Sequence, residues 1–185
     1  CLKALCTEEQ IRELSKLLDL GEQSFDAFRL DYYSDQLWPG RASSPRTNMD
    51  LVYEVCLNYA QKFGRFHFKN LFLTGAPGLG KTFLSACIAG SVSQQGFSVS
   101  YESAAHLFSQ LERERFSPSE ENKQAAEAIR NADLLILDDL GTEMPGQFVT
   151  AALYTLVNDR LMEGKPMIIS TNLNMNQVAD IYSER

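Results

Sequence analysis

A glycine-rich stretch between an apolar strand and a helix contains the residues best suited to chemistry. The segment from Gly75 to Thr82, GAPGLGKT, fits the pattern GxxxxGK[ST]. Glycines let the backbone wrap phosphates with N–H groups, and the helix adds the positive end of its dipole. Lys81 is expected to reach the β- and γ-phosphates, and Thr82 to bind magnesium. The pattern predicts ATP and Mg²⁺ binding by Gly75, Pro77, Gly78, Leu79, Gly80, Lys81, Thr82 and Phe83.

A second candidate site follows the apolar run Leu134 to Leu137, which ends in Asp138 and Asp139. A carboxylate at the end of a buried strand, close to a phosphate loop, can hold the magnesium shell, and its neighbour can polarise an attacking water. We expect Asp138 to bind magnesium and Asp139 to activate water.

A third apolar strand ends in Ser170-Thr171-Asn172. If this strand lies between the phosphate-loop strand and the Asp138 strand, Asn172 stands between the γ-phosphate and the aspartates. Its amide would then sense the γ-phosphate and orient the water. Lys81, Asp139 and Asn172 are therefore the predicted catalytic residues.

Strand and helix patterns alternate along the chain around these motifs. This alternation predicts an α/β fold with a parallel sheet covered by helices on both faces. Strands are expected at 70–74, 98–102, 134–137 and 167–170, and helices at 7–20, 49–63, 81–94, 104–116, 122–131 and 147–163.

The count of strands favours one branch of phosphate-loop proteins. A complete strand and helix separate the phosphate-loop strand from the Asp138 strand, as in ATPases, whereas small-molecule kinases are expected to have the two motif strands next to each other. A kinase would also need an acceptor site and an arginine-bearing lid, and the sequence has no recognisable version of either.

Composition limits the remaining classes. The 185 residues suffice for one main domain, and the net charge of −7 argues against a broad nucleic-acid-binding surface. No apolar run has the length of a membrane span, so a cytoplasmic protein is expected. The four cysteines form no CxxC pair, and Cys87 is predicted to be a buried free thiol.

Together GAPGLGKT, LLILDDLG followed by Thr142 and Glu143, and IISTN resemble the AAA+ ATPases of the bacterial helicase-loader family typified by DnaC and DnaI, with the transposition ATPase IstB as a close relative. The resemblance implies a P-loop NTPase of AAA+ type, a three-layer sandwich that lacks its last strand and lid here. We expect residues 1–46 to form an N-terminal helix and aromatic connector, and 47–185 an incomplete ATPase core. The resemblance also places Phe28 near the adenine, although an aromatic covering the sheet edge is an equal alternative.

The same resemblance implies partners. Such proteins bind the replicative DNA helicase and single-stranded DNA under ATP control, and self-association in a ring or filament is expected. Cys1 and Cys6 would be the remnant of a preceding zinc or helicase-binding domain, although two cysteines cannot complete a four-ligand site. The family's arginine finger is expected beyond Arg185, which predicts weak ATP hydrolysis.

Candidate DNA contacts lie between the second strand and Asp138. They are Arg113, Arg115, Lys123 and Arg130, with Phe116 as a surface for base stacking. The interleaved glutamates favour a solvated helix face instead.

Two alternatives to a helicase loader remain open. One is an IstB-like transposition ATPase, whose partner is a transposase on duplex DNA. The other is a nucleotide-dependent switch with little turnover, because the Asp139 side chain is one methylene shorter than the glutamate usual in AAA+ proteins.

Overall fold

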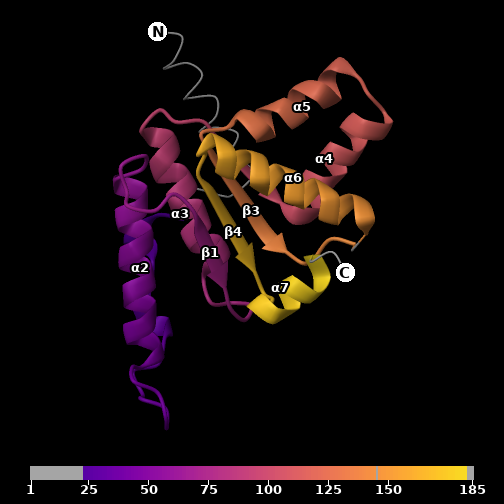
Figure 1. The fold of residues 1–185 in the computed structure, drawn as a ribbon. Coiled ribbons are helices and arrows are strands. Elements are labelled where there is room, and N and C mark those ends of the chain that lie inside the picture. Colours follow the sequence, from indigo (N-terminus) through magenta and orange to yellow (C-terminus); the bar gives the residue numbers. More distant parts are fainter. Residues whose placement is uncertain (1–22, 145, 183–185) are drawn as a thin grey trace.

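The sheet is the element that positions all three motifs. The computed structural model describes residues 23–144 and 146–182. Within them, four parallel strands lie in the order β1-β4-β3-β2 between two layers of helices (Figure 1). The predicted helix at 7–20, Cys1, Cys6 and Arg185 lie outside the described residues. The strands are β1 (Leu71–Thr74), β2 (Val99–Ser103), β3 (Leu134–Leu140) and β4 (Met167–Thr171).

Short polar residues start most of the helices. The hydroxyls of Ser44, Ser103 and Ser119 accept first-turn N–H groups of α2, α4 and α5, whereas α3 begins after Gly80, which has no side chain to do so. The helices are α2 (Pro45–Gln61), α3 (Lys81–Gln94), α4 (Ala104–Phe116), α5 (Glu120–Asn131), α6 (Gln147–Glu163) and α7 (Met175–Tyr182), preceded by the short 3₁₀ helices η1 (Phe25–Ala27) and η2 (Leu30–Tyr32).

The start of α2 differs from the sequence prediction by four residues. Apolar spacing alone predicts a helix from residue 49, but Ser44 caps the helix and Pro45, whose φ already suits a helix, occupies its first turn. The predicted domain boundary between residues 46 and 47 therefore falls within the first turn of α2.

Two hydrophobic cores lie on opposite faces of the sheet. Leu134 and Ile136 of β3 face α2 and α3, while Leu135 and Leu137 face α4 and α6. Figure 1 shows α2 and α3 on one side of the strands and α4, α5 and α6 on the other. A strand buried on both faces has a continuous apolar run, which explains the LLIL pattern.

Two further sequence predictions concern cysteines and membranes. Cys87 is 3% exposed and free, as predicted, and burial raises the pKa of its thiol to about 12. No helix within 23–144 and 146–182 is long and apolar enough to cross a bilayer.

Candidate functional site

A phosphate cradle lies where β1 ends and α3 begins. Gly78 and Gly80 have φ angles of 78° and 87°, in the left-handed region that favours glycine, and they turn the chain into α3. The first N–H groups of α3 have no partner within the helix, so they are available to an anion. A cavity of about 350 Å³ opens here, lined by Pro77, Gly78, Gly80, Lys81, Thr82, Phe83, Asp139 and Asn172.

The cradle brings residues of all three motifs together. Lys81 Nζ donates hydrogen bonds to Asn172 Oδ1 at 2.7 Å and to the carbonyl oxygens of Gly75 and Ala76 at 2.8 and 3.0 Å. Asn172 Nδ2 donates to Asp139 Oδ1 at 3.3 Å. The strand β4 lies between β1 and β3, which is the order under which Asn172 was expected to lie near the aspartates, and Asn172 bonds to both Lys81 and Asp139.

Not every predicted phosphate-loop residue lines this cavity. Gly75 and Leu79 belong to the same loop but are not among its lining residues. Gly75 contributes its carbonyl oxygen to Lys81, and Leu79 is 41% exposed. These residues shape the loop while their neighbours face the cavity.

The two aspartates have different surroundings because β3 is irregular at this point. The pairing of β3 with β4 shifts between Leu137 and Leu140, and Asp139 has φ 57°, the only positive φ of a non-glycine residue in the described part of the chain. The Asp139 N–H donates to Ser170 Oγ at 3.0 Å. Asp139 thus lines the cradle, while Asp138, 7% exposed, is not among the lining residues.

The available donors fit a magnesium ion that is held together with phosphates. The described residues contain no group of three or more His, Cys, Asp or Glu side chains able to hold a metal alone. Magnesium is commonly bound by one or two carboxylates with substrate phosphates, and the Asp138 carboxylate and Thr82 hydroxyl are hard oxygen donors of that kind.

Aromatic side chains of residues 25–33 pack against the phosphate loop. The Phe28 ring lies 5.7 Å from that of Phe83, a cradle residue, and 5.3 Å from that of Tyr53. The Tyr33 hydroxyl donates to the Leu79 carbonyl oxygen at 3.2 Å. A Cβ on Gly80 would lie 2.9 Å from this hydroxyl, and the φ of 87° also favours glycine at this position. These contacts place the aromatic part of residues 25–33 against the phosphate loop.

Two residues that contact Asp138 were not predicted as site residues from the sequence. The Tyr101 hydroxyl donates to Asp138 Oδ2 at 2.8 Å, and the Ser170 hydroxyl donates to Asp138 Oδ1. Ser170 belongs to the Ser-Thr-Asn triplet, so its proximity was foreseeable, but no motif distinguishes Tyr101 from other aromatic strand residues.

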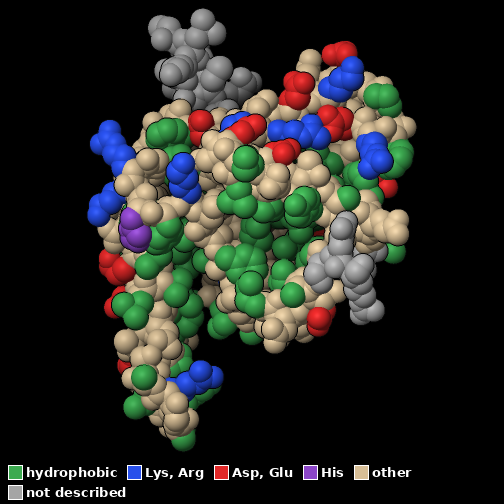
Figure 2. Space-filling view, viewed as in Figure 1, with side chains coloured by type: hydrophobic (Ala, Val, Ile, Leu, Met, Phe, Trp, Pro, Cys, Tyr) green, Lys and Arg blue, Asp and Glu red, His purple; other side chains and the backbone are tan. Residues whose placement is uncertain are grey.

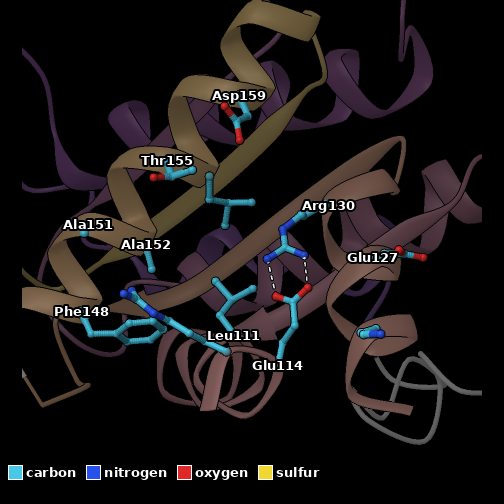
Figure 3. A pocket seen from close by; sticks show the side chains of 12 residues that line it. Leu111, Glu114, Glu127, Arg130, Phe148, Ala151, Ala152, Thr155 and Asp159 are labelled. Carbon is cyan, nitrogen blue, oxygen red and sulfur yellow. Dashed lines mark hydrogen bonds and ion pairs between the residues drawn. The ribbon is translucent and has the colours of Figure 1, made fainter. Parts of the chain in front are cut away.

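Three of the candidate DNA contacts, Arg115, Lys123 and Arg130, line a groove between α4, α5 and α6 (Figure 3), whereas Arg113 is not among its lining residues. In Figure 3, Arg130 and Glu114 point toward each other; the guanidinium donates to both carboxylate oxygens, at 2.7 and 2.5 Å. The guanidinium of Arg115 lies 5.4 Å from the ring centre of Phe116 and 5.7 Å from that of Phe148. Both terminal nitrogens of Arg130 are therefore bonded to Glu114, so this arginine is less available to a DNA phosphate.

A phosphate loop joined to α3, with β4 between the two motif strands, defines a P-loop ATPase fold of the AAA+ type. The structure resembles the crystal structure of the DnaC helicase loader, with a TM-score of 0.67 over 86% of this chain and 89% of that one at 19% identity. It also resembles AMPPCP-bound DnaA from Aquifex aeolicus, with a TM-score of 0.62 over 86% of this chain and 47% of that one at 18% identity. At these identities the likeness shows the fold.

Sequence comparison identifies the family. The family described as IstB-like ATP binding protein matches residues 63–185. The chain therefore belongs to the IstB-like ATP-binding proteins.

Individual relatives come from two functional settings. The replicative helicase loader DnaC of Escherichia coli K12 is 25% identical over 116 residues, 63% of this chain and 47% of that protein. A putative insertion sequence ATP-binding protein of Sinorhizobium fredii is 32% identical over 103 residues, 56% of this chain and 34% of that protein. The chain thus spans less than half the length of these relatives.

Proposed function

We propose that this chain binds ATP with magnesium, hydrolyses it, and uses the nucleotide to control binding of a replicative DNA helicase and single-stranded DNA. The observation that carries the ATPase part is the chain of hydrogen bonds from Lys81 through Asn172 to Asp139. It joins a phosphate-binding cation, a polar sensor and a carboxylate in one cavity.

Each residue of the site has a role in this proposal. Lys81 exchanges its bonds to Asn172 and the loop carbonyls for phosphate oxygens, and Asn172 is then free to orient a water. Asp139 accepts a proton from that water as it attacks. Thr82 and Asp138 would hold a magnesium ion, which would neutralise charge on the phosphates.

Phe28 is proposed to border the adenine. Its ring contacts Phe83 and Tyr53 beside the loop, so an adenine entering from the phosphate cradle would meet an aromatic surface.

Hydrolysis by a single subunit is proposed to be slow. Of the described residues that line the cradle, Lys81 is the one with a positive charge. An arginine supplied in trans contributes about 10³- to 10⁵-fold in related phosphoryl transfers. A neighbouring subunit would supply that arginine.

Self-association is supported by apolar side chains that no described residue covers. Tyr154, Leu161 and Met162 of α6 are 73%, 54% and 81% exposed. Figure 2 shows hydrophobic side chains gathered over the middle of the face that α6 and α7 occupy. Exposed apolar patches on a monomer mark interaction sites.

For single-stranded DNA, Arg113, Arg115 and Phe116 remain as proposed contacts. Phe116 is 64% exposed at the end of α4, and the Arg115 guanidinium lies over its ring. An exposed aromatic beside arginines offers base stacking together with phosphate contacts.

A transposition ATPase is the second candidate. The matching family and the 32% identical insertion sequence protein support it as directly as the helicase loader supports the first. In that case the partner is a transposase on duplex DNA.

Replacing Asp139 with Asn tests hydrolysis. We expect ATP affinity to stay within about threefold of wild type while turnover falls about 100-fold, because the general base is lost. Asp159→Asn, an exposed aspartate of α6, is the matched control and should turn over ATP normally. Equal turnover by Asp139→Asn and wild type would instead support a switch that does not depend on hydrolysis.

The partner is tested by ATP-dependent pull-down with a hexameric replicative helicase and single-stranded DNA, and in parallel with a transposase on duplex DNA. ATP-gated capture of the helicase supports the loader. ATP-gated capture of only the transposase complex would overturn the loader in favour of the transposition ATPase.

A further inference from the structure

The carboxylate of Asp138 is held from both sides by hydroxyl groups of neighbouring strands. Tyr101 of β2 donates to Oδ2 at 2.8 Å, and Ser170 of β4 donates to Oδ1. Each oxygen of a carboxylate can accept more than one hydrogen bond, so both keep acceptor capacity. The side chain is 7% exposed, and a buried carboxylate with two such partners has one favoured orientation.

The sheet register explains why Tyr101 reaches this position. Tyr101 is paired with Ile136 of β3, and its ring packs in the same core as Ile136, on the α3 face. Asp138 follows two residues later on β3. Two residues along a strand span about 6.6 Å, a distance that the long side chain of tyrosine can cross. A shorter residue at 101 would not place a hydroxyl there.

The hydroxyl groups of Tyr101 and Ser170 do not neutralise the negative charge of Asp138. Within residues 23–144 and 146–182, Asp138 forms no salt bridge with Lys, Arg or His. A tyrosine hydroxyl is a neutral donor, and here it donates to Asp138 Oδ2 at 2.8 Å. A neutral donor orients the carboxylate without cancelling the negative charge that a cation needs.

We propose that Tyr101 is a positioning residue for the magnesium ion: its hydroxyl, together with that of Ser170, fixes Asp138 in the orientation that binds the ion. This inference rests on the proposed ATP-binding function. It assigns to β2, the strand outside the three motifs, a direct role in the site.

Tyr101→Phe tests the proposal because it removes the hydroxyl and keeps the ring. The binding of mant-ATP is titrated with EDTA present and then with increasing Mg²⁺. In EDTA we expect Tyr101→Phe to bind mant-ATP with the same affinity as wild type. The Mg²⁺ concentration that gives half of the maximal increase in mant-ATP binding should rise about tenfold, the size of effect typical when a partner of a metal ligand is lost.

Tyr59→Phe is the matched control. Tyr59 is 1% exposed, and its hydroxyl donates to the Lys69 carbonyl oxygen at 2.7 Å, remote from Asp138 in the contacts it makes. This variant loses a buried tyrosine hydroxyl and should keep the wild-type Mg²⁺ dependence. A Mg²⁺ dependence of Tyr101→Phe equal to that of wild type would overturn the proposal.

Two further variants separate positioning from general damage. Ser170→Ala removes the other donor, together with the acceptor of the Asp139 N–H, and should also raise the Mg²⁺ requirement, which gives a second test if Tyr101→Phe folds poorly. An unchanged Mg²⁺ requirement of Ser170→Ala would contradict the proposal. In an Asp138→Asn background, Tyr101→Phe should add no further loss, since the two residues act through one carboxylate; an additive loss would contradict this. Absence of Mg²⁺-dependent nucleotide binding in wild type would overturn the proposed function itself.

Discussion

At the scale of single residues, the site depends on a backbone conformation that an aspartate adopts at a cost. Asp139 lies in the left-handed region at φ 57°, where a side chain with a Cβ costs roughly 1–2 kcal/mol relative to glycine. The Asp139 N–H bond to Ser170 and the Asn172 bond to its carboxylate hold it there. Strain of this kind is typical of functional positions and agrees with the proposed role of Asp139 as the base.

Comparing Asp139→Gly with Asp139→Ala isolates this backbone cost, because both variants lack the carboxylate. We expect the glycine variant to be more stable than the alanine variant by about 1 kcal/mol in urea denaturation, since only glycine adopts this φ freely. At Gln124, an exposed interior position of α5, the order should reverse, with alanine favoured by about 1 kcal/mol. If the alanine variant were more stable than the glycine variant at both positions, backbone strain at Asp139 would be excluded.

At the scale of elements, one buried arginine connects three segments at the amino-terminal ends of the strands, opposite the cradle. Arg160 of α6 is 1% exposed and donates to the carbonyl oxygens of Arg130, Ala132 and Pro166 at 3.1, 3.0 and 2.7 Å. It therefore joins the end of α5 to the residues that precede β3 and β4. Burial lowers the pKa of this guanidinium.

Replacing Arg160 with Ala should destabilise the fold by about 3 kcal/mol, because three hydrogen bonds of a buried cation are lost. The Ala132 carbonyl oxygen loses its donor, whereas those of Pro166 and Arg130 keep Leu135 N–H and Lys165 Nζ. Arg113→Ala, at an exposed helical position, should change stability by no more than about 0.5 kcal/mol. Both free energies are measured by urea denaturation. A loss below about 1 kcal/mol for Arg160→Ala would show that the three carbonyls find other partners.

Elements with a strong periodic pattern were predictable from the sequence. The bounds of α3 and α6 agree with prediction, because continuous helical spacing and a terminal glycine define them. The strand β3 extends to Leu140, three residues past the prediction, because polar Asp138 and Asp139 end the apolar run but not the pairing. The helix α7 was not predicted.

The candidate site divides in the same way. That Lys81, Asn172 and Asp139 share one cavity was predictable, because each belongs to a recognisable motif at the end of a strand. The hydroxyl of Tyr101 was not, since it reaches Asp138 through register between two strands that a single sequence does not reveal.

At the scale of the whole molecule, the fold brings distant segments to one edge of a sheet. The carboxyl ends of β1, β3 and β4 meet because β4 lies between the other two, and the aromatic segment before α2 packs on the same loop. The net charge of −7 is compatible with nucleotide binding because Lys81 and the N-terminal N–H groups of α3 make the cradle locally positive. We therefore expect this end of the sheet to bind ATP.

The most direct test is the binding of mant-ATP with Mg²⁺ to wild type, Lys81→Ala and the exposed control Lys62→Ala. We expect Lys81→Ala to bind about 100-fold more weakly, because charge-assisted hydrogen bonds to phosphate are lost, and Lys62→Ala to match wild type. Equal binding by Lys81→Ala and wild type, or no binding by wild type, would contradict the account.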